Sequence, residues 1–307
     1  MENITLNNGI LMPILGYGVY QVTPDECERC VLDALEVGYR HIDTAQAYFN
    51  EQQVGNAIKK SGIARKDIFL TSKVWLEHFG YEECRKSVLV SLEKLQTEYI
   101  DLMLLHQPFG DAYGAWRALE ELVQEGKLRA IGISNFYVDR FVEFCNFACN
   151  DWTRADGTIV KGIRPAVNQI EIHPYHTQSQ QLEWMQKYGV QPEAWAPLNE
   201  GRNGIFNDPV LLDIASNHGK SLHQVVLRWH VQRGIVIFPM SRNKEHMIDN
   251  FNIFDFTLSD DEMERINALD RGQSAFFSHQ NPDMVEWFVQ MVEARKKPEG
   301  QNVQKKW

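Results

Sequence analysis

Short apolar runs of strand length alternate along the chain with segments whose apolar positions recur at helical spacing. The runs are nearly continuous, as in strands buried on both faces of a parallel sheet, and lie at residues 15–19, 39–44, 68–74, 100–106, 128–134, 166–172, 190–196 and 235–238. Helical patterns lie between them, for example at residues 81–95, 112–125, 179–187 and 222–232. This alternation predicts an α/β fold, a closed (β/α)8 barrel (TIM barrel) rather than an open sheet.

Three segments lie outside the repeating strand-and-helix units. Residues 4–6 and 10–12 flank an Asn-Asn-Gly turn, which predicts an N-terminal β-hairpin before the first barrel strand. Residues 150–164 are polar and read as an inserted loop, and residues 271–307 form a C-terminal extension beyond the last unit. We therefore expect one barrel domain over residues 1–307.

Composition and charge exclude several classes of protein. The chain has 307 residues, 44% of them hydrophobic, and 31 Lys and Arg against 41 Asp and Glu give a formal net charge of −10. Such an acidic chain is a poor partner for nucleic acid or an anionic membrane surface. Neither a secretory signal nor a membrane-spanning run is visible in the sequence. We expect a cytoplasmic protein.

The five cysteines do not indicate a disulfide framework, because their number is odd. Cys27 and Cys30 resemble a C-x-x-C pair, but they fall with Val31, Ala34 and Leu35 on one stripe of an amphipathic helix. Cysteine packs well as a small apolar residue. The spacing therefore predicts core packing rather than metal or redox chemistry.

Two other short motifs are incomplete. His173-Pro-Tyr-His176 resembles a metal-binding pair, but a proline follows the first histidine, and we see no carboxylate or cysteine nearby in the pattern. Gly16-Tyr17-Gly18 resembles the start of a Rossmann fingerprint, but Gln21 stands where the third glycine would be. We predict no metal site and no Rossmann domain.

Polar residues stand at or near the carboxyl ends of several predicted strands: Asp43, Tyr48, Lys73 and His106. Catalytic groups of (β/α)8 barrels gather at that end. A lysine within a barrel strand is buried and needs a charge partner, which Asp43 can supply. A structural ion pair that fills the barrel mouth is the alternative interpretation, and His106 alone could be a core histidine. The convergence of four such groups favours chemistry.

A tyrosine beside a Lys–Asp pair has a defined chemical use. The ammonium lowers the cost of forming phenolate, so we expect Lys73 to bring the pKa of Tyr48 down from about 10. Tyr48 can then donate a proton to an oxygen that becomes negative. A neutral His106 that donates from the other side would orient a carbonyl group between the two.

The segments that carry these residues resemble the aldo-keto reductase family. The resemblance rests on residues 38–48, 104–108, 126–136 and 168–175, and it runs from about residue 4 to 270 in the family's order. It is greatest for the bacterial 2,5-diketo-gluconate reductase and prostaglandin F synthase-like branch. It implies a catalytic tetrad of Asp43, Tyr48, Lys73 and His106, in which Tyr48 is the general acid for reduction of an aldehyde or ketone by hydride from a nicotinamide cofactor.

The resemblance also implies positions around the ligands. The cofactor-binding positions are Gly18, Val19, Tyr20, Asp43, Ser134, Asn135, Gln169, Trp195, Leu198, Met240, Ser241, Arg242, His246 and Asn250. Ser134, Asn135 and Gln169 would hold the carboxamide, and Trp195 takes the place of a tyrosine that stacks on the nicotinamide. The substrate pocket would be lined by Tyr20, Trp75, Gln107 and Phe109. Aromatic residues of the tail resemble the loops that set specificity: Phe276, Phe277 and Trp287.

One departure from the family concerns the choice of cofactor. The family usually has lysine where Met240 stands and arginine where His246 stands, and both cations clamp the 2′-phosphate of NADP(H). Ser241 and Asn250 remain, and Arg242 could reach the phosphate. The loss of two charge-assisted contacts weakens NADPH more than NADH. We therefore expect NADP(H) or NAD(H), with dual or NADH-leaning use.

Two other functions stay open at this point. A non-catalytic barrel could bind nucleotide as a redox sensor or partner subunit, although such members commonly lose part of the tetrad. A lyase or isomerase could use Lys73 as a Schiff base. For a reductase, the expected partner is a small-molecule carbonyl substrate, and the family's common case is a monomer. The physiological substrate and the role of residues 150–164 do not follow from the pattern.

Overall fold

The computed structural model describes residues 2–296, and a parallel sheet of eight strands forms its centre. In chain order the strands are β3 (Tyr17–Gly18), β4 (His41–Asp43), β5 (Phe69–Val74), β6 (Ile100–Leu105), β7 (Leu128–Ser134), β10 (Val167–Glu171), β11 (Gln191–Trp195) and β12 (Val236–Ile237). Each strand pairs in parallel with the next one in that order. Their bounds lie within one or two residues of the predicted runs.

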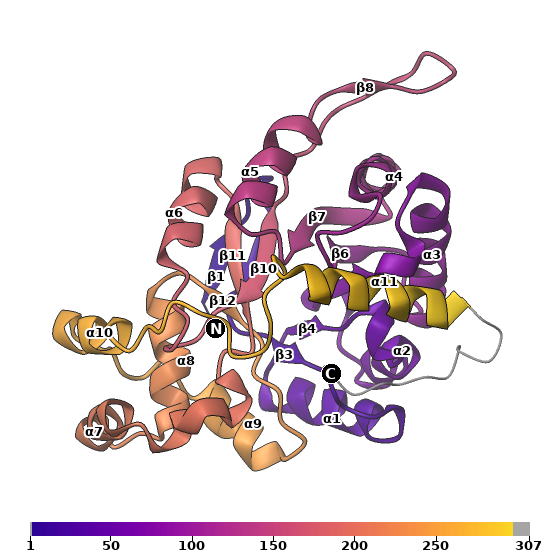
Figure 1. Ribbon diagram of the computed structural model, residues 1–307. Helices are drawn as coiled ribbons and strands as arrows, with labels where there is room; N and C mark the ends of the chain where they lie inside the picture. The colour runs from indigo at the N-terminus through magenta and orange to yellow at the C-terminus, as the bar shows by residue number, and fades with distance from the viewer. Residues whose placement is uncertain (1, 297–307) are drawn as a thin grey trace.

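Hydrogen bonds between the first and last strands close the sheet. Leu15 pairs in parallel with Ile237, the Gly16 N–H donates to the Ile237 carbonyl at 2.9 Å, and the Ile237 N–H donates to Ile14 at 3.0 Å. A Cβ on Gly16 would lie 2.6 Å from the ring of Phe238, so only glycine allows this approach. The predicted (β/α)8 barrel is confirmed (Figure 1).

Helices surround the barrel; most lie between successive strands, and the last three follow β12 (Figure 1). They are α1 (Pro24–Val37), α2 (Glu51–Lys60), α3 (Tyr81–Lys94), α4 (Ala112–Gln124), α5 (Val138–Phe147), α6 (Ser179–Tyr188), α7 (Pro209–His218), α8 (Leu222–Gln232), α9 (Lys244–Phe251), α10 (Asp260–Asn267) and α11 (Pro282–Lys296). Short 3₁₀ segments cover Gln46–Tyr48, Arg65–Asp67, Leu76–His78 and, with a kink, Asn199–Asn207. Over residues 2–296, no helix is both long and apolar enough to cross a bilayer.

Helix α1 packs its predicted stripe against the barrel. Its buried residues are Cys27, Cys30, Val31, Ala34 and Leu35. The spacing thus predicted the core packing of Cys27 and Cys30, and all five cysteines of the chain are free. Burial raises the pKa of the Cys27 thiol to about 12, so this cysteine stays protonated and packs as an apolar side chain.

The N-terminal hairpin is also confirmed. Strands β1 (Asn3–Thr5) and β2 (Leu11–Pro13) pair antiparallel, and Gly9 in the turn has φ +84°. The Asn7 side chain donates to the carbonyl of Pro165, just before β10 begins. The hairpin therefore lies at the amino ends of the barrel strands, opposite the end at which the polar residues gather.

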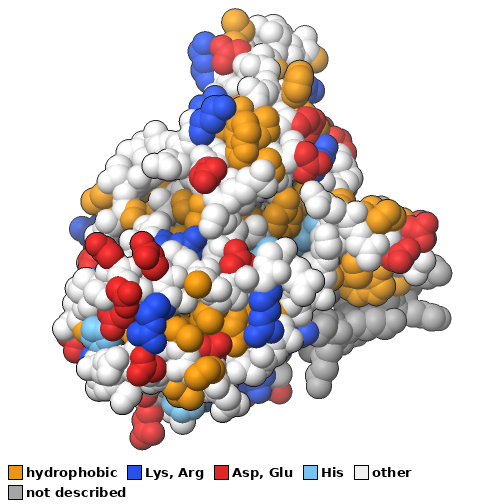
Figure 2. Space-filling model, turned by 60° about the vertical axis from the view of Figure 1, so that its left-hand side comes forward, with side chains coloured by type: hydrophobic (Ala, Val, Ile, Leu, Met, Phe, Trp, Pro, Cys, Tyr) orange, Lys and Arg blue, Asp and Glu red, His pale blue; other side chains and the backbone are white. Residues whose placement is uncertain are grey.

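Residues 150–164 form a second hairpin rather than an unstructured loop. Its strands are β8 (Trp152–Thr153) and β9 (Ile159–Val160), and it projects away from the barrel (Figures 1 and 2). Its base is fixed to α4, because the carboxylate of Glu120 accepts the indole N–H of Trp152 at 2.8 Å and the N–H of Ile163 at 2.7 Å. No residue of this insert lines the cavity at the barrel mouth.

Candidate active site

A cavity of about 650 Å³ opens at the carboxyl ends of the barrel strands. It gathers predicted residues from the ends of all eight strands and the loops that follow them, from α9 and from the C-terminal tail. The predicted residues that line it are Gly18, Tyr20, Asp43, Tyr48, Trp75, His106, Gln107, Ser134, Asn135, Gln169, Trp195, Leu198, Met240, Ser241, His246, Asn250, Phe276 and Phe277. The structure therefore brings most of the expected site together at one place.

Three of the predicted ligand-binding residues do not line the cavity. Val19 is buried and contributes its N–H to the backbone carbonyl of Asp43 rather than a surface to the cavity. Phe109 packs behind the cavity wall, with its ring 5.3 Å from that of Phe288. The Arg242 guanidinium donates to the backbone oxygen of Gln21 at 2.6 Å and pairs with Glu26 at 3.4 Å. None of the three lines the cavity, and their contact with a ligand stays a prediction.

The ammonium of Lys73 lies buried directly behind the cavity. Its Nζ donates to Asp43 Oδ1 at 2.6 Å, to the carbonyl of Thr44 at 2.9 Å and to the hydroxyl oxygen of Tyr48 at 3.3 Å. These contacts use all three N–H groups of the ammonium. Because the Tyr48 oxygen accepts from Lys73, its own O–H is left to donate, and Tyr48 lines the cavity.

The charge around Tyr48 differs from the sequence expectation. Burial raises the pKa of its hydroxyl well above 10, and the nearby Asp43 carboxylate raises it further. The expected net lowering of this pKa is therefore not found: burial and the Asp43 carboxylate, which is paired with the Lys73 ammonium at 2.6 Å, outweigh the effect of that ammonium. Tyr48 therefore keeps its proton at neutral pH, which suits a proton donor.

His106 follows β6 and faces Tyr48 across the cavity, with ring centroids 5.7 Å apart. Burial lowers its pKa well below 6.5, and the positive charge of Lys73 acts in the same direction. The imidazole is therefore neutral. Its Nδ1 is buried without a hydrogen-bond partner within residues 2–296. A neutral imidazole donates from one nitrogen only, so His106 can orient an oxygen but is a poor acid.

An amide network connects these groups to the next strands. Gln169 on β10 donates from Nε2 to Asp43 Oδ2 at 3.1 Å and to Glu193 Oε2 at 3.0 Å, which leaves its Oε1 for a ligand. Asn135, at φ +65°, accepts the indole N–H of Trp195 at 2.8 Å. Its own amide donates to the backbone oxygen of His106 at 3.1 Å. The amides and the indole ring are thus held in fixed orientations at the cavity wall.

Comparison with known proteins places this arrangement in a family. A model of the aldo/keto reductase family matches residues 14–271. The chain belongs to this family. Glyoxal reductase of Bacillus subtilis is 43% identical over 274 residues, which are 89% of this chain and 94% of that protein. Methylglyoxal reductase DkgA of Escherichia coli is 39% identical over 273 residues, or 88% and 94% of the two chains.

Solved structures of family members have the same fold. The aldo/keto reductase from Brucella melitensis has a TM-score of 0.80 at 40% identity and covers 88% of this chain and 99% of its own. A mutant of Gox0644 in complex with NADPH has a TM-score of 0.80 at 34% identity and covers 89% and 96%. This aldo/keto reductase is an oxidoreductase acting on carbonyl groups, and the reading as a non-catalytic nucleotide-binding barrel is disfavoured.

In this aldo/keto reductase, the cavity wall formed by Met240 and α9 carries little positive charge. Met240 is 37% exposed, and His246 and Asn250 follow it on α9. Asp249, which the sequence analysis did not single out, adds a carboxylate to the same wall. Neither of the two cations usual in the family is present here.

The C-terminal tail supplies another wall. Phe276, Phe277 and His279 line the cavity, and His279 Nε2 donates to Gln107 Oε1 at 2.8 Å. Trp287 lies on α11, with its ring 5.2 Å from that of Phe288, and does not line the cavity. Phe276, Phe277 and His279 are thus the tail residues at the cavity, and their role in substrate specificity stays a prediction.

Further lining residues were not predicted. They are Gln21, Ala47, Ala196, Pro197, Glu200, Phe206, Ser221, His223, Phe238, Pro239, Asp249 and His279. Several are sequence neighbours of predicted positions, and that proximity was the available signal. Phe206, Ser221 and His223 have no such neighbour, because tertiary contacts bring their segments to the cavity.

The two histidines of the incomplete metal motif are used for structure. His173 Nε2 lies 2.9 Å from Glu171 Oε1, and His176 Nε2 lies 2.9 Å from Gln178 Nε2. The expectation that no carboxylate lies near is therefore wrong, since Glu171 stands two residues before His173. Within residues 2–296, no group of three or more His, Cys, Asp or Glu side chains could hold a metal ion.

Glu193 is a buried carboxyl group beneath the site, and it gives a pH-dependent prediction. Burial raises its pKa to about 8, and the Asp43 carboxylate adds to the rise. An unfolded chain releases this proton near pH 4.3. Between about pH 4.3 and pH 8 Glu193 is therefore more protonated in the native state than in the unfolded state. Over this range it makes the free energy of unfolding fall as pH rises.

We expect Glu193→Gln to remove this pH-dependent fall in the free energy of unfolding, because the glutamine amide does not ionise. Its amide oxygen can still accept the hydrogen bond from Gln169. The melting temperature of the variant should gain on that of the wild type as pH rises from about 5 to about 8. Thermal melts across this range measure the difference. A difference that stays constant with pH would contradict the assignment.

Proposed function

We propose that this chain reduces small aldehydes and ketones with a nicotinamide cofactor, and that Tyr48 donates the proton. The observation that carries the proposal is the Tyr48 hydroxyl, which accepts from Lys73 at 3.3 Å and is thereby oriented to donate into the cavity. Two relatives named as reductases of glyoxal and methylglyoxal support small, oxygen-rich carbonyl compounds as the substrate class.

The cavity walls fit a nicotinamide cofactor, which when bound supplies the hydride. An aromatic side chain, Trp195, is held by Asn135, and the free Oε1 of Gln169 can accept from a carboxamide. The Ser134 hydroxyl donates to the backbone oxygen of Gln169 at 2.8 Å, which fixes that strand end. These side chains would bind and orient the nicotinamide beside Tyr48.

The protein's own side chains would supply the proton and stabilise the group that loses it. Tyr48 would donate its proton to the carbonyl oxygen as that oxygen becomes negative. The Lys73 ammonium would stabilise the phenolate that remains, and Asp43 would hold the ammonium in place. His106 would donate to the same oxygen and orient the carbonyl. Lys73 does not line the cavity, which disfavours the alternative of a Schiff-base enzyme.

We also propose dual or NADH-leaning cofactor use. Met240 and His246 replace two cations, Arg242 is engaged by Gln21, and the Asp249 carboxylate lies on the same wall. A 2′-phosphate would therefore find few charged donors there. Fluorescence titration tests this proposal, and NADPH binding more than about ten times tighter than NADH would overturn it.

The matching gain-of-charge variant sharpens the cofactor test. We expect Met240→Lys/His246→Arg to tighten NADPH binding by at least about tenfold, since each charge-assisted contact contributes roughly 1.5–3 kcal/mol. NADH has no 2′-phosphate, so its affinity for the same variant should change by no more than about threefold. Equal gains for both nucleotides would show that these positions do not meet the phosphate.

A panel of aldehydes and ketones, assayed with each nucleotide, tests the proposed function as a whole. Turnover of 4-nitrobenzaldehyde or methylglyoxal with either nucleotide supports it. Tight nucleotide binding without turnover of any carbonyl would instead support the redox-sensor alternative. The single domain, the monomeric state, the absence of nucleic-acid binding and the cytoplasmic location remain predictions.

A further inference from the structure

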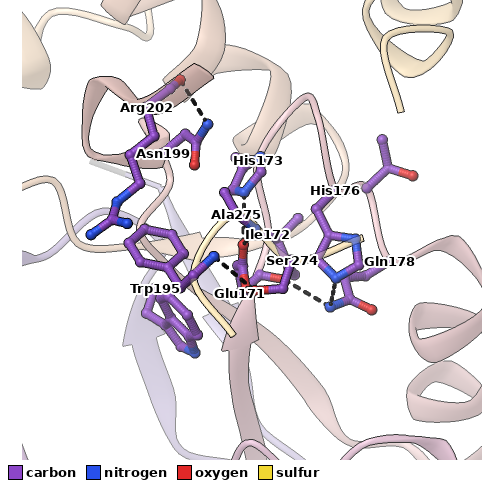
Figure 3. Close-up of polar contacts among 12 residues, drawn as sticks. Glu171, Ile172, His173, His176, Gln178, Trp195, Asn199, Arg202, Ser274 and Ala275 are labelled. Atoms are coloured by element: carbon purple, nitrogen blue, oxygen red, sulfur yellow. Dashed lines mark hydrogen bonds and ion pairs between the residues drawn. The ribbon is translucent and has the colours of Figure 1, made fainter. Parts of the chain in front are cut away.

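Glu171 is a buried carboxyl group that the proposed chemistry does not use. It ends β10, two residues after Gln169, so both side chains leave the strand on the same face. Glu171 is completely buried and does not line the cavity. Its surroundings are drawn in Figure 3.

Three donors converge on this carboxylate. The Ser274 hydroxyl donates to Oε2 at 2.6 Å, the Ala275 N–H donates to Oε1 at 2.8 Å, and His173 Nε2 lies 2.9 Å from Oε1 (Figure 3). Burial opposes ionisation of Glu171, but the contacts with His173, Ser274 and Ala275 outweigh it and lower the pKa of the carboxyl group. Glu171 is therefore a carboxylate at neutral pH, and its hydrogen bonds are charge-assisted.

The Ser274 hydroxyl also holds the next two residues of the tail. Its oxygen accepts the backbone N–H groups of Phe276 and Phe277, each at 3.0 Å. Together with the Ala275 N–H on Glu171, these bonds hold three successive backbone N–H groups. The contact between Glu171 at the end of β10 and the Ser274 hydroxyl thus sets the backbone conformation of the tail at the barrel mouth.

That conformation places aromatic rings in the cavity wall. Phe276 lies edge-on to Trp195 with centroids 5.1 Å apart, and the Arg202 guanidinium lies 4.2 Å over its ring. Phe277 lies 4.7 Å from the ring of His279, which is itself joined to Gln107. All of these except Arg202 line the cavity.

We infer that Glu171 and Ser274 are positioning residues that hold tail residues 274–279 as the wall of the carbonyl-binding part of the cavity. The inference rests on the proposed function, because it assigns this wall to the substrate. Neither residue touches the reacting atoms. Trp195 keeps its separate hydrogen bond to Asn135, and Tyr48 is held by Lys73 from another strand. Release of the tail should therefore weaken substrate binding and leave nucleotide binding and the proton donor in place.

The test is Ser274→Ala in the full chain, compared with Ser274→Thr and Ser259→Ala. Ser274→Thr keeps the hydroxyl group. Ser259 is a matched control, because its hydroxyl also donates to a glutamate, Glu262, and accepts that residue's N–H, but at the start of α10 and outside the cavity lining. Glu171→Gln is a second, more severe variant.

We expect Ser274→Ala to raise KM for 4-nitrobenzaldehyde by at least about fivefold, with kcat and nucleotide Kd within about threefold of wild type. Hydrogen exchange in a peptide that spans residues 272–280 should become faster. Ser274→Thr should restore both readouts, and Ser259→Ala should move neither. Glu171→Gln should change both in the direction of Ser274→Ala.

Three results would overturn the inference: an unchanged KM and exchange rate in Ser274→Ala, an equal rise of KM in Ser259→Ala, or a loss of nucleotide affinity as large as the rise in KM. A wild-type protein that turns over no carbonyl compound refutes the proposed function. In that case the exchange experiment still decides whether Glu171 and Ser274 hold the tail.

Discussion

Replacement of Tyr48 by phenylalanine should lower kcat/KM for carbonyl reduction by about two to four orders of magnitude, the usual contribution of a general acid. The hydroxyl is the group that Lys73 orients towards the cavity, and no nearby side chain replaces it, because the neutral His106 is a poor acid. Steady-state kinetics with 4-nitrobenzaldehyde measure the loss. Nucleotide Kd should stay within about threefold, because the phenyl ring still fills the same wall.

Tyr20→Phe is the matched control for this prediction. Tyr20 lines the same cavity and its ring lies 5.1 Å from that of Tyr48, but it has no hydrogen bond from Lys73. Burial raises the pKa of Tyr20 above its usual value as well, so the two phenols differ mainly in their partner. Similar losses in both variants, or retained turnover in Tyr48→Phe, would show that Tyr48 is not the proton donor.

The barrel was readable from the sequence because its strands are buried on both faces. β7 (Leu128–Ser134) has the predicted bounds, and the stripe of Cys27 and Cys30 on α1 is buried as the helical spacing required. The hairpin of residues 150–164 could not be predicted from their polar composition. Its base depends on Glu120, a residue of α4 that lies some thirty positions earlier in the chain.

The candidate site was readable where strand ends fix it. Asp43, Tyr48, Lys73 and His106 follow or lie on successive strands, so the barrel itself brings them together. The direction of the Tyr48 pKa shift could not be predicted from the sequence, because it depends on burial and on the ion pair between Lys73 and Asp43. The contact of His279 with Gln107 could not be predicted either, because it joins the tail to a strand end 172 positions earlier in the chain.

Replacement of Lys73 by methionine should reduce activity by about 10²-fold or more. Two opposite unit charges about 4 Å apart attract each other by about 4 kcal/mol at an effective dielectric constant of about 20. Lys73 Nζ lies 3.3 Å from the Tyr48 oxygen, and Asp43 offsets part of its effect. The same change leaves the buried Asp43 carboxylate without its cation, which should lower the free energy of unfolding by about 3–5 kcal/mol. Kinetics and denaturant titration measure the two effects separately.

The double variant Lys73→Met/Asp43→Asn separates chemistry from stability. An asparagine in place of Asp43 carries no charge and can still accept from Gln169, so most of the lost stability should return. Activity should not return, because the ammonium beside Tyr48 is still absent. A double variant that recovers turnover together with stability would show that Lys73 only supports the fold. Borohydride treatment of wild type with substrate should leave Lys73 unlabelled, whereas a Schiff-base enzyme would be trapped there.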